Sequence, residues 1–304
     1  MNKRLMNRLH ELKVPRSDMS KPALFITNDD GIEAPGIQEL IRQLNIEGFP
    51  LFVLAPSTEQ SATGMRISVR KKLKVTNRQD IADKLQSDQN IPLKMYSLDG
   101  SPCDCVIAAL DGGIHILEPE LMPTMCISGV NQGPNISIDI MHSGTVSAAR
   151  ESALYGLPSI AVSLATYEHS NFEYSVKGAI EVMQSCLDFL PKVPSDFLRT
   201  NGSKSVIEMS SNSESIRANF ALGNIFLNLN APVRWNGDFN TVSLGSRWYR
   251  NAIKSHELDD GSMAFEVAAA AVSSRLATTA GGVRSPRFRR DTLPARRGGR
   301  VKNG

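Results

Sequence analysis

The chain has 304 residues, of which 41% are hydrophobic and 21% are charged, and its formal net charge is +3 at pH 7. This composition is ordinary for a soluble globular protein, and the length suffices for one or two domains. The sequence contains no run of about 18 apolar residues, so we expect no membrane span. The basic N-terminus is not followed by the apolar segment of a secretory signal.

Charge is distributed unevenly along the chain. Residues 271–304 contain eight Arg and one Lys against one Asp, a net charge of +8, which leaves 3 − 8 = −5 for the rest. Only this basic tail resembles a nucleic-acid or membrane-surface patch. The cysteine spacing fits neither a zinc site nor a disulfide framework, so we expect free thiols and a cytoplasmic protein; the cysteines are Cys103, Cys105, Cys126 and Cys186.

The first predicted element is a short buried strand. Residues 1–20 are polar and are predicted to be a flexible extension. The apolar run over 24–26 then ends abruptly in Asn-Asp-Asp-Gly at 28–31, which is typical of a buried parallel strand bounded by turn residues. A helix-compatible stretch, 36–44, follows Pro35.

Strand-like and helix-like segments alternate up to about residue 190. Residues 67–98 are charged and alternating, which favours an antiparallel excursion at a sheet edge. We predict further strands over 51–55, 125–127, 159–163 and 224–230, and helices over 104–110, 145–155 and 173–190. This alternation predicts an α/β fold with a doubly wound, mostly parallel sheet covered by helices on both faces.

We therefore divide the chain into four parts. Residues 21–192 are the predicted α/β catalytic core, and 193–267 are a smaller, irregular C-terminal extension with a possible role in oligomerisation. Residues 268–304 are rich in Ala, Gly, Arg and Pro and are predicted to be disordered.

Two adjacent carboxylates, Asp29 and Asp30, stand where the first strand meets its helix. Ligands bind at the carboxyl ends of strands in open parallel sheets. Two like charges held together repel unless a cation neutralises them, and hard oxygen ligands suit Mg²⁺, Mn²⁺ or Ca²⁺. A plain turn that caps the helix explains this segment alone equally well.

Three more polar clusters follow later strands or open a helix, over 59–64, 128–135 and 142–145. Oxygen atoms from the first two of these could complete a hard-metal site with the carboxylates. Ser143-Gly144-Thr145 at a helix N-terminus is a potential anion site. Taken alone, Ser143 and Thr145 are better explained as helix caps, and His142 as a surface or packing residue. Asn131 and Asn135 are equally well explained as turn residues.

Five segments together resemble the SurE family of metal-dependent acid phosphatases and 5′/3′-nucleotidases. The resemblance covers residues 22–166 and extends more weakly to 232. It implies a Rossmann-like three-layer α/β/α sandwich, one divalent metal ion such as Mg²⁺ or Mn²⁺, nucleoside monophosphate substrates, and a homodimer or tetramer assembled through C-terminal extensions. The segments are 28–36, 55–64, 100–106, 128–135 and 143–145.

The resemblance also assigns roles to individual residues. It implies metal ligands at Asp29, Asp30, Ser61 and Asn131, and phosphate contacts at Asn135, Ser143, Gly144 and Thr145. For the hydrolysis itself, our hypothesis is that Asp29 or Asp30 also orients or deprotonates the attacking water. Asn28 would orient the metal pair, and Asp104 would be structural. His142 replaces an aromatic residue common in the family, and the Arg-rich tail departs from the family's usual ending.

The sequence thus predicts a metal-dependent phosphomonoesterase acting on nucleoside monophosphates. The alternative is a phosphate-ligand or nucleic-acid binding protein with impaired catalysis and an altered C-terminus, in which nucleic acid would bind only through the basic tail.

Overall fold

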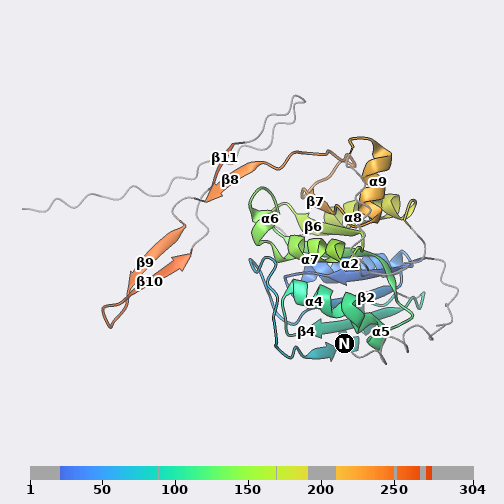
Figure 1. Ribbon diagram of the computed structural model, residues 1–304, viewed down its shortest axis with the longest axis horizontal. Helices are drawn as coiled ribbons and strands as arrows, with labels where there is room; N and C mark the ends of the chain where they lie inside the picture. Colours follow the sequence, from blue (N-terminus) through green and yellow to red (C-terminus); the bar gives the residue numbers. More distant parts are fainter. Residues whose placement is uncertain are drawn as a thin grey trace, which may run out of the picture.

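The computed structural model describes residues 21–87, 89–168, 170–190, 210–249, 252–267 and 272–275. The predicted N-terminal extension, 1–20, lies outside these residues. Within them the chain forms one large α/β body and two separate two-stranded pairs, which are drawn away from that body (Figure 1).

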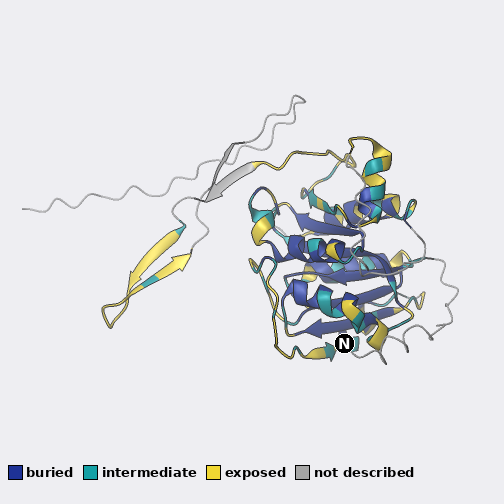
Figure 2. Cartoon of the chain, in the orientation of Figure 1, coloured by how far each residue is buried: buried dark blue, intermediate teal, exposed yellow. Residues whose placement is uncertain are grey.

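A seven-stranded sheet lies at the centre of the α/β body. Its strand order is β3-β4-β2-β1-β5-β6-β7, and every neighbouring pair is parallel except β3 with β4. The apolar runs of β1, β2 and β6 are buried at every position, as expected for strands covered on both faces (Figure 2). The strands are β1 (Ala23–Thr27), β2 (Leu51–Pro56), β3 (Val75–Asn77), β4 (Leu93–Leu98), β5 (Pro123–Gln132), β6 (Ser159–Leu164) and β7 (Leu227–Ala231).

Helices cover both faces of this sheet. One core cluster joins Leu24 and Ile26 of β1 to helices α2 and α8, and the other joins Phe25 to helices α4 and α7. Alternate residues of one strand therefore enter opposite cores, which confirms the predicted three-layer α/β/α arrangement. The helical segments are α2 (Pro35–Ile46), α3 (Gln79–Leu85), α4 (Pro102–Ala108), η1 (Ala109–Gly113), α5 (Ile114–Leu117), α6 (Asp139–His142), α7 (Gly144–Leu154), α8 (Glu173–Leu187) and α9 (Ser213–Ala221).

The segment 67–98 was only partly predicted correctly. β3 is the expected antiparallel edge strand, but β4 lies inside the sheet, parallel to β2. The prediction rested on the charged, alternating residues 68–75, which precede both strands, whereas β4 itself is buried at every position except Lys94, whose ammonium group lies 3.9 Å from Glu118.

The sheet continues beyond residue 192. β7 pairs with β6 in parallel, with Leu229 opposite Val162, although it lies in the range assigned to the C-terminal extension. The division at residue 192 therefore does not mark the end of the sheet, and the proposed roles of the separate parts remain predictions.

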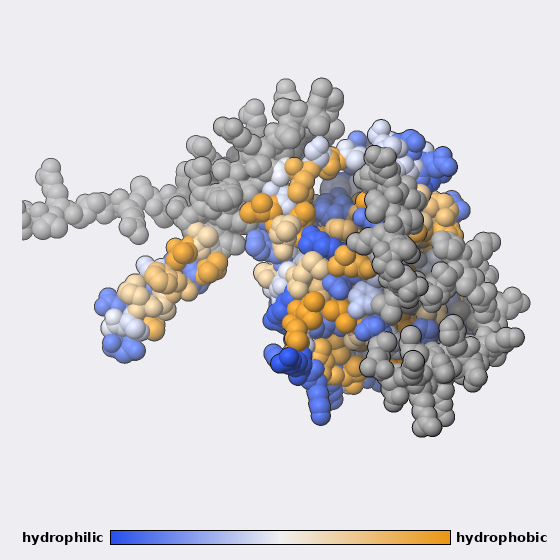
Figure 3. Space-filling view, viewed as in Figure 1, coloured by the Kyte–Doolittle hydropathy of each residue, from blue (hydrophilic) through white to orange (hydrophobic). Residues whose placement is uncertain are grey.

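The C-terminal region contains two antiparallel strand pairs. β8 (Ser246–Tyr249) pairs with β11 (Val272–Arg275), and β9 (Ile253–Glu257) pairs with β10 (Met263–Val267). β11 lies in the tail predicted to be disordered, and the rest of that tail is outside the described residues. The β9–β10 hairpin is exposed, with apolar side chains along it and hydrophilic residues at its tip (Figure 3).

Two predictions from composition agree with the described part of the chain. None of its helices combines the length and apolarity required to cross a membrane. All four cysteines are buried and free.

Candidate functional site

The sheet changes winding direction at β1, which lies between β2 and β5. Crevices at such a switch point, outside the carboxyl ends of the strands, are where open α/β sheets bind ligands. β1 leads directly into Asn28, Asp29 and Asp30, and β5 ends with Asn131 and Gln132. The topology therefore brings two of the predicted polar clusters, 28–31 and 128–135, together at the carboxyl ends of neighbouring strands.

Asp29 lies against the N-terminus of α7. Its carboxylate is only 3% exposed and accepts hydrogen bonds from the Thr145 hydroxyl and from the backbone N–H groups of Thr145 and Gly144. Burial raises the pKa of Asp29 above its ordinary value, although these hydrogen bonds act to lower it. A Cβ atom on Gly144 would lie 2.6 Å from the Asp29 Cβ, so this close approach requires glycine.

Asp30 is the more accessible of the two carboxylates. Its Oδ2 accepts a hydrogen bond of 3.3 Å from the backbone N–H of Gln132, at the end of β5. Burial, followed by repulsion from Asp29, raises the pKa of Asp30 to about 7. Without a cation, two ionised carboxylates at this place oppose each other.

The loop after β2 contacts the main chain of the residues that carry these carboxylates. The N–H of Gln60 donates to the main-chain oxygen of Asp29 over 2.7 Å. Gly31, with a φ of +98°, lies so close that an added Cβ would be 3.2 Å from the carbonyl carbon of Thr58. Ser61 is adjacent to this contact, but its exposed hydroxyl donates to Glu59 Oε1 over 2.8 Å rather than to either aspartate.

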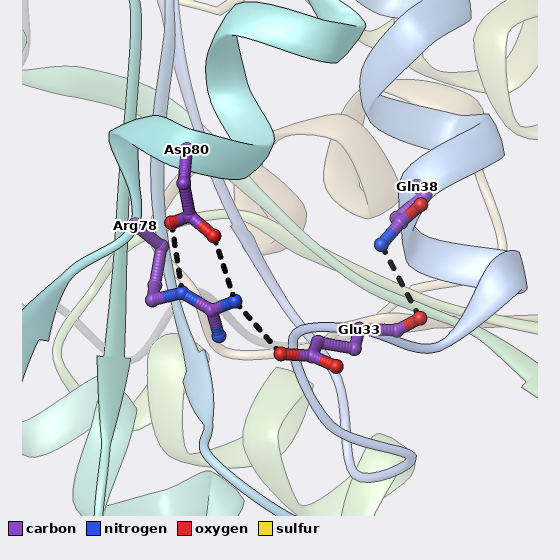
Figure 4. Close-up of polar contacts among 4 residues, drawn as sticks. All are labelled: Glu33, Gln38, Arg78 and Asp80. Carbon is purple, nitrogen blue, oxygen red and sulfur yellow. Dashed lines mark hydrogen bonds and ion pairs between the residues drawn. The ribbon is translucent and has the colours of Figure 1, made fainter.

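An ion-pair network ties the loop after Asp30 to the sheet edge (Figure 4). Arg78 donates to Glu33 Oε1 over 2.7 Å and to both carboxylate oxygens of Asp80, and Gln38 donates to the backbone oxygen of Glu33. The hydrogen bonds that Arg78 donates to Asp80 and then to Glu33 raise the pKa of Arg78. Surface ion pairs contribute little stability, so the network's main effect is to restrain this loop.

Asn131 leaves one oxygen uncommitted. Its Nδ2 donates to the backbone oxygen of Gly133 over 2.8 Å, which leaves Oδ1 as a potential cation ligand. The β5 register shifts between Ser128 and Asn131, where β5 pairs with β6. The next residue, Gln132, donates its backbone N–H to Asp30. Asn131 is therefore the immediate neighbour in sequence of a residue that contacts the carboxylate pair.

Three buried oxygen atoms at or near these strand ends lack a hydrogen-bond partner among the described residues: Thr27 Oγ1, Asn28 Oδ1 and Ser128 Oγ. Asn28 is held by its Nδ2, which donates to the Gly31 oxygen over 2.8 Å. Carboxylate, amide and hydroxyl oxygens form a donor set that fits a hard divalent cation and its water molecules. Within the described ranges no three His, Cys, Asp or Glu residues group into a metal site, so neutral oxygens and water would have to complete the coordination.

Asn135 is buried and held by several polar groups. Its Nδ2 donates to the Ser163 hydroxyl over 2.8 Å, and its backbone N–H donates to Asn230 Oδ1 over 2.8 Å. Its backbone oxygen accepts from the side chains of Asn228 and Asn230 over 2.9 and 3.1 Å. This clamp from β7 was not predicted; the signal for it was the alternation Leu-Asn-Leu-Asn, which places both asparagines on one face of a strand.

The helix-capping alternative for Ser143 describes its contacts well. The Ser143 hydroxyl accepts a hydrogen bond of 3.0 Å from the Val146 N–H and caps α7. The side chain of His142 is exposed, as in the surface interpretation, and its backbone oxygen accepts from Gly64. Thr145 and Gly144 contact Asp29, so the phosphate-binding roles of residues 143–145 remain predictions.

Asp104 contacts its own helix end and a neighbouring loop. It forms a capping box with Ser101, and its Oδ1 accepts from the Ser68 N–H over 2.8 Å. Burial acts to raise the pKa of Asp104, but these hydrogen bonds outweigh it and the pKa lies below its ordinary value. These contacts are consistent with a structural role.

Two relatives of similar sequence carry the same name. The chain is 41% identical over 174 residues to a protein of Flavobacterium psychrophilum, covering 56% of this chain and 62% of the relative. It is 39% identical over 150 residues to a protein of Natranaerobius thermophilus, covering 49% and 54%. Both are named 5′-nucleotidase SurE, and the matches span roughly half to three-fifths of their length.

The fold has a solved counterpart. The crystal structure of SurE protein from Aquifex aeolicus superimposes with a TM-score of 0.55 at 24% identity, covering 83% of this chain and 82% of that one. The sequence pattern of the family described as Survival protein SurE matches residues 24–254, which is most of the chain. The chain therefore belongs to the survival protein SurE family.

Proposed function

We propose that this protein is a metal-dependent phosphomonoesterase that hydrolyses nucleoside monophosphates to nucleoside and phosphate. The observation that carries the proposal is the pair of adjacent carboxylates, Asp29 and Asp30, at the switch point of the sheet. The relatives named 5′-nucleotidase SurE support this substrate class.

Asp29, Asp30 and Asn131 would hold the metal ion, and Ser61 would join them after turning away from Glu59. A bound divalent cation would neutralise phosphate charge and make a coordinated water more acidic. Asp29 occupies the N–H groups that begin α7, so a phosphate at this helix end would meet a negative charge. That repulsion is a physical reason for a cation in the site.

The protein's own groups then have separable tasks. Because Gln132 engages Oδ2 of Asp30, the Oδ1 atom is left to orient a water molecule and to accept its proton. Asn135, Ser143, Gly144 and Thr145 are the proposed phosphate contacts, and Gly144 and Thr145 would have to exchange Asp29 for the phosphate. The clamp from β7 would fix the main chain at Asn135 before substrate arrives, and such preorganisation favours catalysis.

The test is hydrolysis of 5′- and 3′-nucleoside monophosphates by the full chain, with Mg²⁺, with Mn²⁺ and after treatment with a chelator. Asp30→Asn should lower turnover by about two to three orders of magnitude, the scale of losing a principal electrostatic contact. Asp83→Asn is the matched control, because Asp83 is an exposed aspartate on α3 whose side chain accepts a hydrogen bond from Gln79 on the same helix. Undiminished turnover in Asp30→Asn, or full activity in the chelator, would contradict the proposal.

The alternative, a binding protein with impaired catalysis, depends on the basic tail, and no described contact favours it. We retain the homo-oligomer as a proposal. It is supported by the exposed apolar side chains of the β9–β10 hairpin, among them Phe265 and Val267, which are 68% and 81% exposed. Light scattering on the full chain and on a Phe265→Ser variant would test it, and an unchanged mass in the variant would remove this support.

A further inference from the structure

A tyrosine ring covers the loop that connects the candidate metal and phosphate residues. Tyr167 belongs to the turn after β6, at the same sheet edge as the carboxylates, and is 66% exposed. One side of its ring rests on Gly133: a Cβ atom there would lie 2.1 Å from the ring Cε1 and 2.5 Å from Cζ. Any residue other than glycine at 133 would displace the ring, while much of the ring remains open to solvent.

The turn that carries Tyr167 is fixed by hydrogen bonds on both sides of the residue. The backbone oxygen of Leu164 accepts from Gly133 over 3.0 Å and from Thr166 over 2.8 Å. The Thr166 hydroxyl accepts from the N–H of Glu168 over 3.1 Å. The ring is therefore presented by an ordered backbone, which reduces the conformational entropy that binding would otherwise cost.

The position of the ring relative to the site follows from chain geometry. Gly133 lies two residues after Asn131 and two residues before Asn135. Two peptide units span at most about 7 Å, so the glycine that supports the ring stands within that distance of the backbone at both residues. A nucleoside monophosphate places its base one ribose away from its phosphate, so a ring beside this loop is a candidate to contact the base of a nucleotide whose phosphate is held at Asn135.

We infer that Tyr167 is the platform on which the base of the nucleotide stacks, with Gly133 supporting the opposite side of the ring. This inference rests on the proposed function and adds a reason for preferring nucleotides to simple sugar phosphates. Stacking on an aromatic ring tolerates any base because each has a π-face. Tyr167 is thus a residue of substrate specificity, separate from the groups that act on the phosphate.

The experiment compares two substrates that share the phosphate end. AMP carries a base and ribose 5-phosphate does not, and both are hydrolysed by wild type, Tyr167→Ala and Tyr167→Phe under the same metal conditions. Adenosine binding is measured by calorimetry on the same proteins. Ile116→Ala is the control. Ile116 is an 81% exposed apolar residue on α5, which leads into the N-terminal end of β5, whereas the candidate site lies at the carboxyl ends of the strands.

In Tyr167→Ala, kcat/KM for AMP and adenosine affinity should each fall about 5- to 150-fold, the range measured for one base–aromatic stack. Ribose 5-phosphate hydrolysis should be unchanged, and Tyr167→Phe should resemble wild type. Equal losses for AMP and ribose 5-phosphate, or wild-type adenosine affinity in Tyr167→Ala, would overturn the inference, as would absence of adenosine binding by wild type. Failure of wild type to hydrolyse either substrate would instead count against the proposed phosphomonoesterase.

Discussion

Replacing Asp30 with asparagine should stabilise the protein when no metal is present. The carboxylate lies beside buried Asp29, and burial and this neighbour raise its pKa from 3.8 to about 7. Because the pKa in the folded state exceeds that in the unfolded state, the folded protein holds an extra proton between these values. The stability that protonated Asp30 contributes to the folded state is therefore fully present at low pH and is lost as the pH rises through about 7.

The magnitude follows from the same shift. Each pH unit between the two pKa values changes the free energy of unfolding by about 1.4 kcal/mol per proton, so the interval from pH 5 to pH 7 corresponds to about 3 kcal/mol. The asparagine side chain of the Asp30→Asn variant carries no charge, and its amide oxygen can still accept from Gln132. The free energy of unfolding of this variant, relative to that of wild type, should accordingly increase by up to about 3 kcal/mol between about pH 5 and about pH 8.

Urea unfolding of both proteins in a chelator, at both pH values, measures this difference. Repeating the titration with Mn²⁺ should reverse the order at the higher pH, because only wild type retains the pair that binds the cation and gains stability from it. An advantage that does not change with pH in the chelator would refute the claim that the two carboxylates oppose each other. A variant that gains as much stability from Mn²⁺ as wild type would refute the shared metal site.

Three further substitutions probe the surroundings of the pair. Thr145→Val removes the hydroxyl that donates to Asp29 and should cost about 1–3 kcal/mol of unfolding free energy in urea titrations; Thr145→Ser should retain most of it. Gly144→Ala places a new Cβ against Asp29 at the first position of α7, so Tm should fall and metal affinity should decrease. Asn230→Ala removes two hydrogen bonds to the main chain of Asn135 and should raise KM for the phosphomonoester more than it lowers kcat, in steady-state assays.

Much of the fold could be predicted from local patterns. The apolar runs ending in turn residues identified β1, β2, β5 and β6, and the rule that ligands bind at strand ends placed the aspartates and Asn131 at one edge. β4 was misjudged because the charged alternation of residues 68–75 was extended over the whole of 67–98, although β4 is buried at nearly every position. Such an error is expected where tertiary burial overrides a local pattern.

The contacts inside the site were harder to predict, because they join residues far apart in sequence. The Asp29–Thr145 hydrogen bond spans 116 residues and depends on how closely α7 approaches β1. The β7 clamp on Asn135 spans 95 residues and depends on the pairing of β7 with β6. Spacing along the chain contains no information about either approach, so the sequence could propose the members of the site but not which of them touch.

The β7 clamp also sets an order of events during synthesis on the ribosome, where domains tend to fold from the N-terminus as they emerge. A nascent chain that has emerged only as far as β6 already contains Asp29, Asp30 and Asn131. It does not yet contain Asn228 and Asn230, which hold the main chain of Asn135. The proposed phosphate side of the site would thus be completed only after the metal side, when the last strand of the sheet has left the exit tunnel.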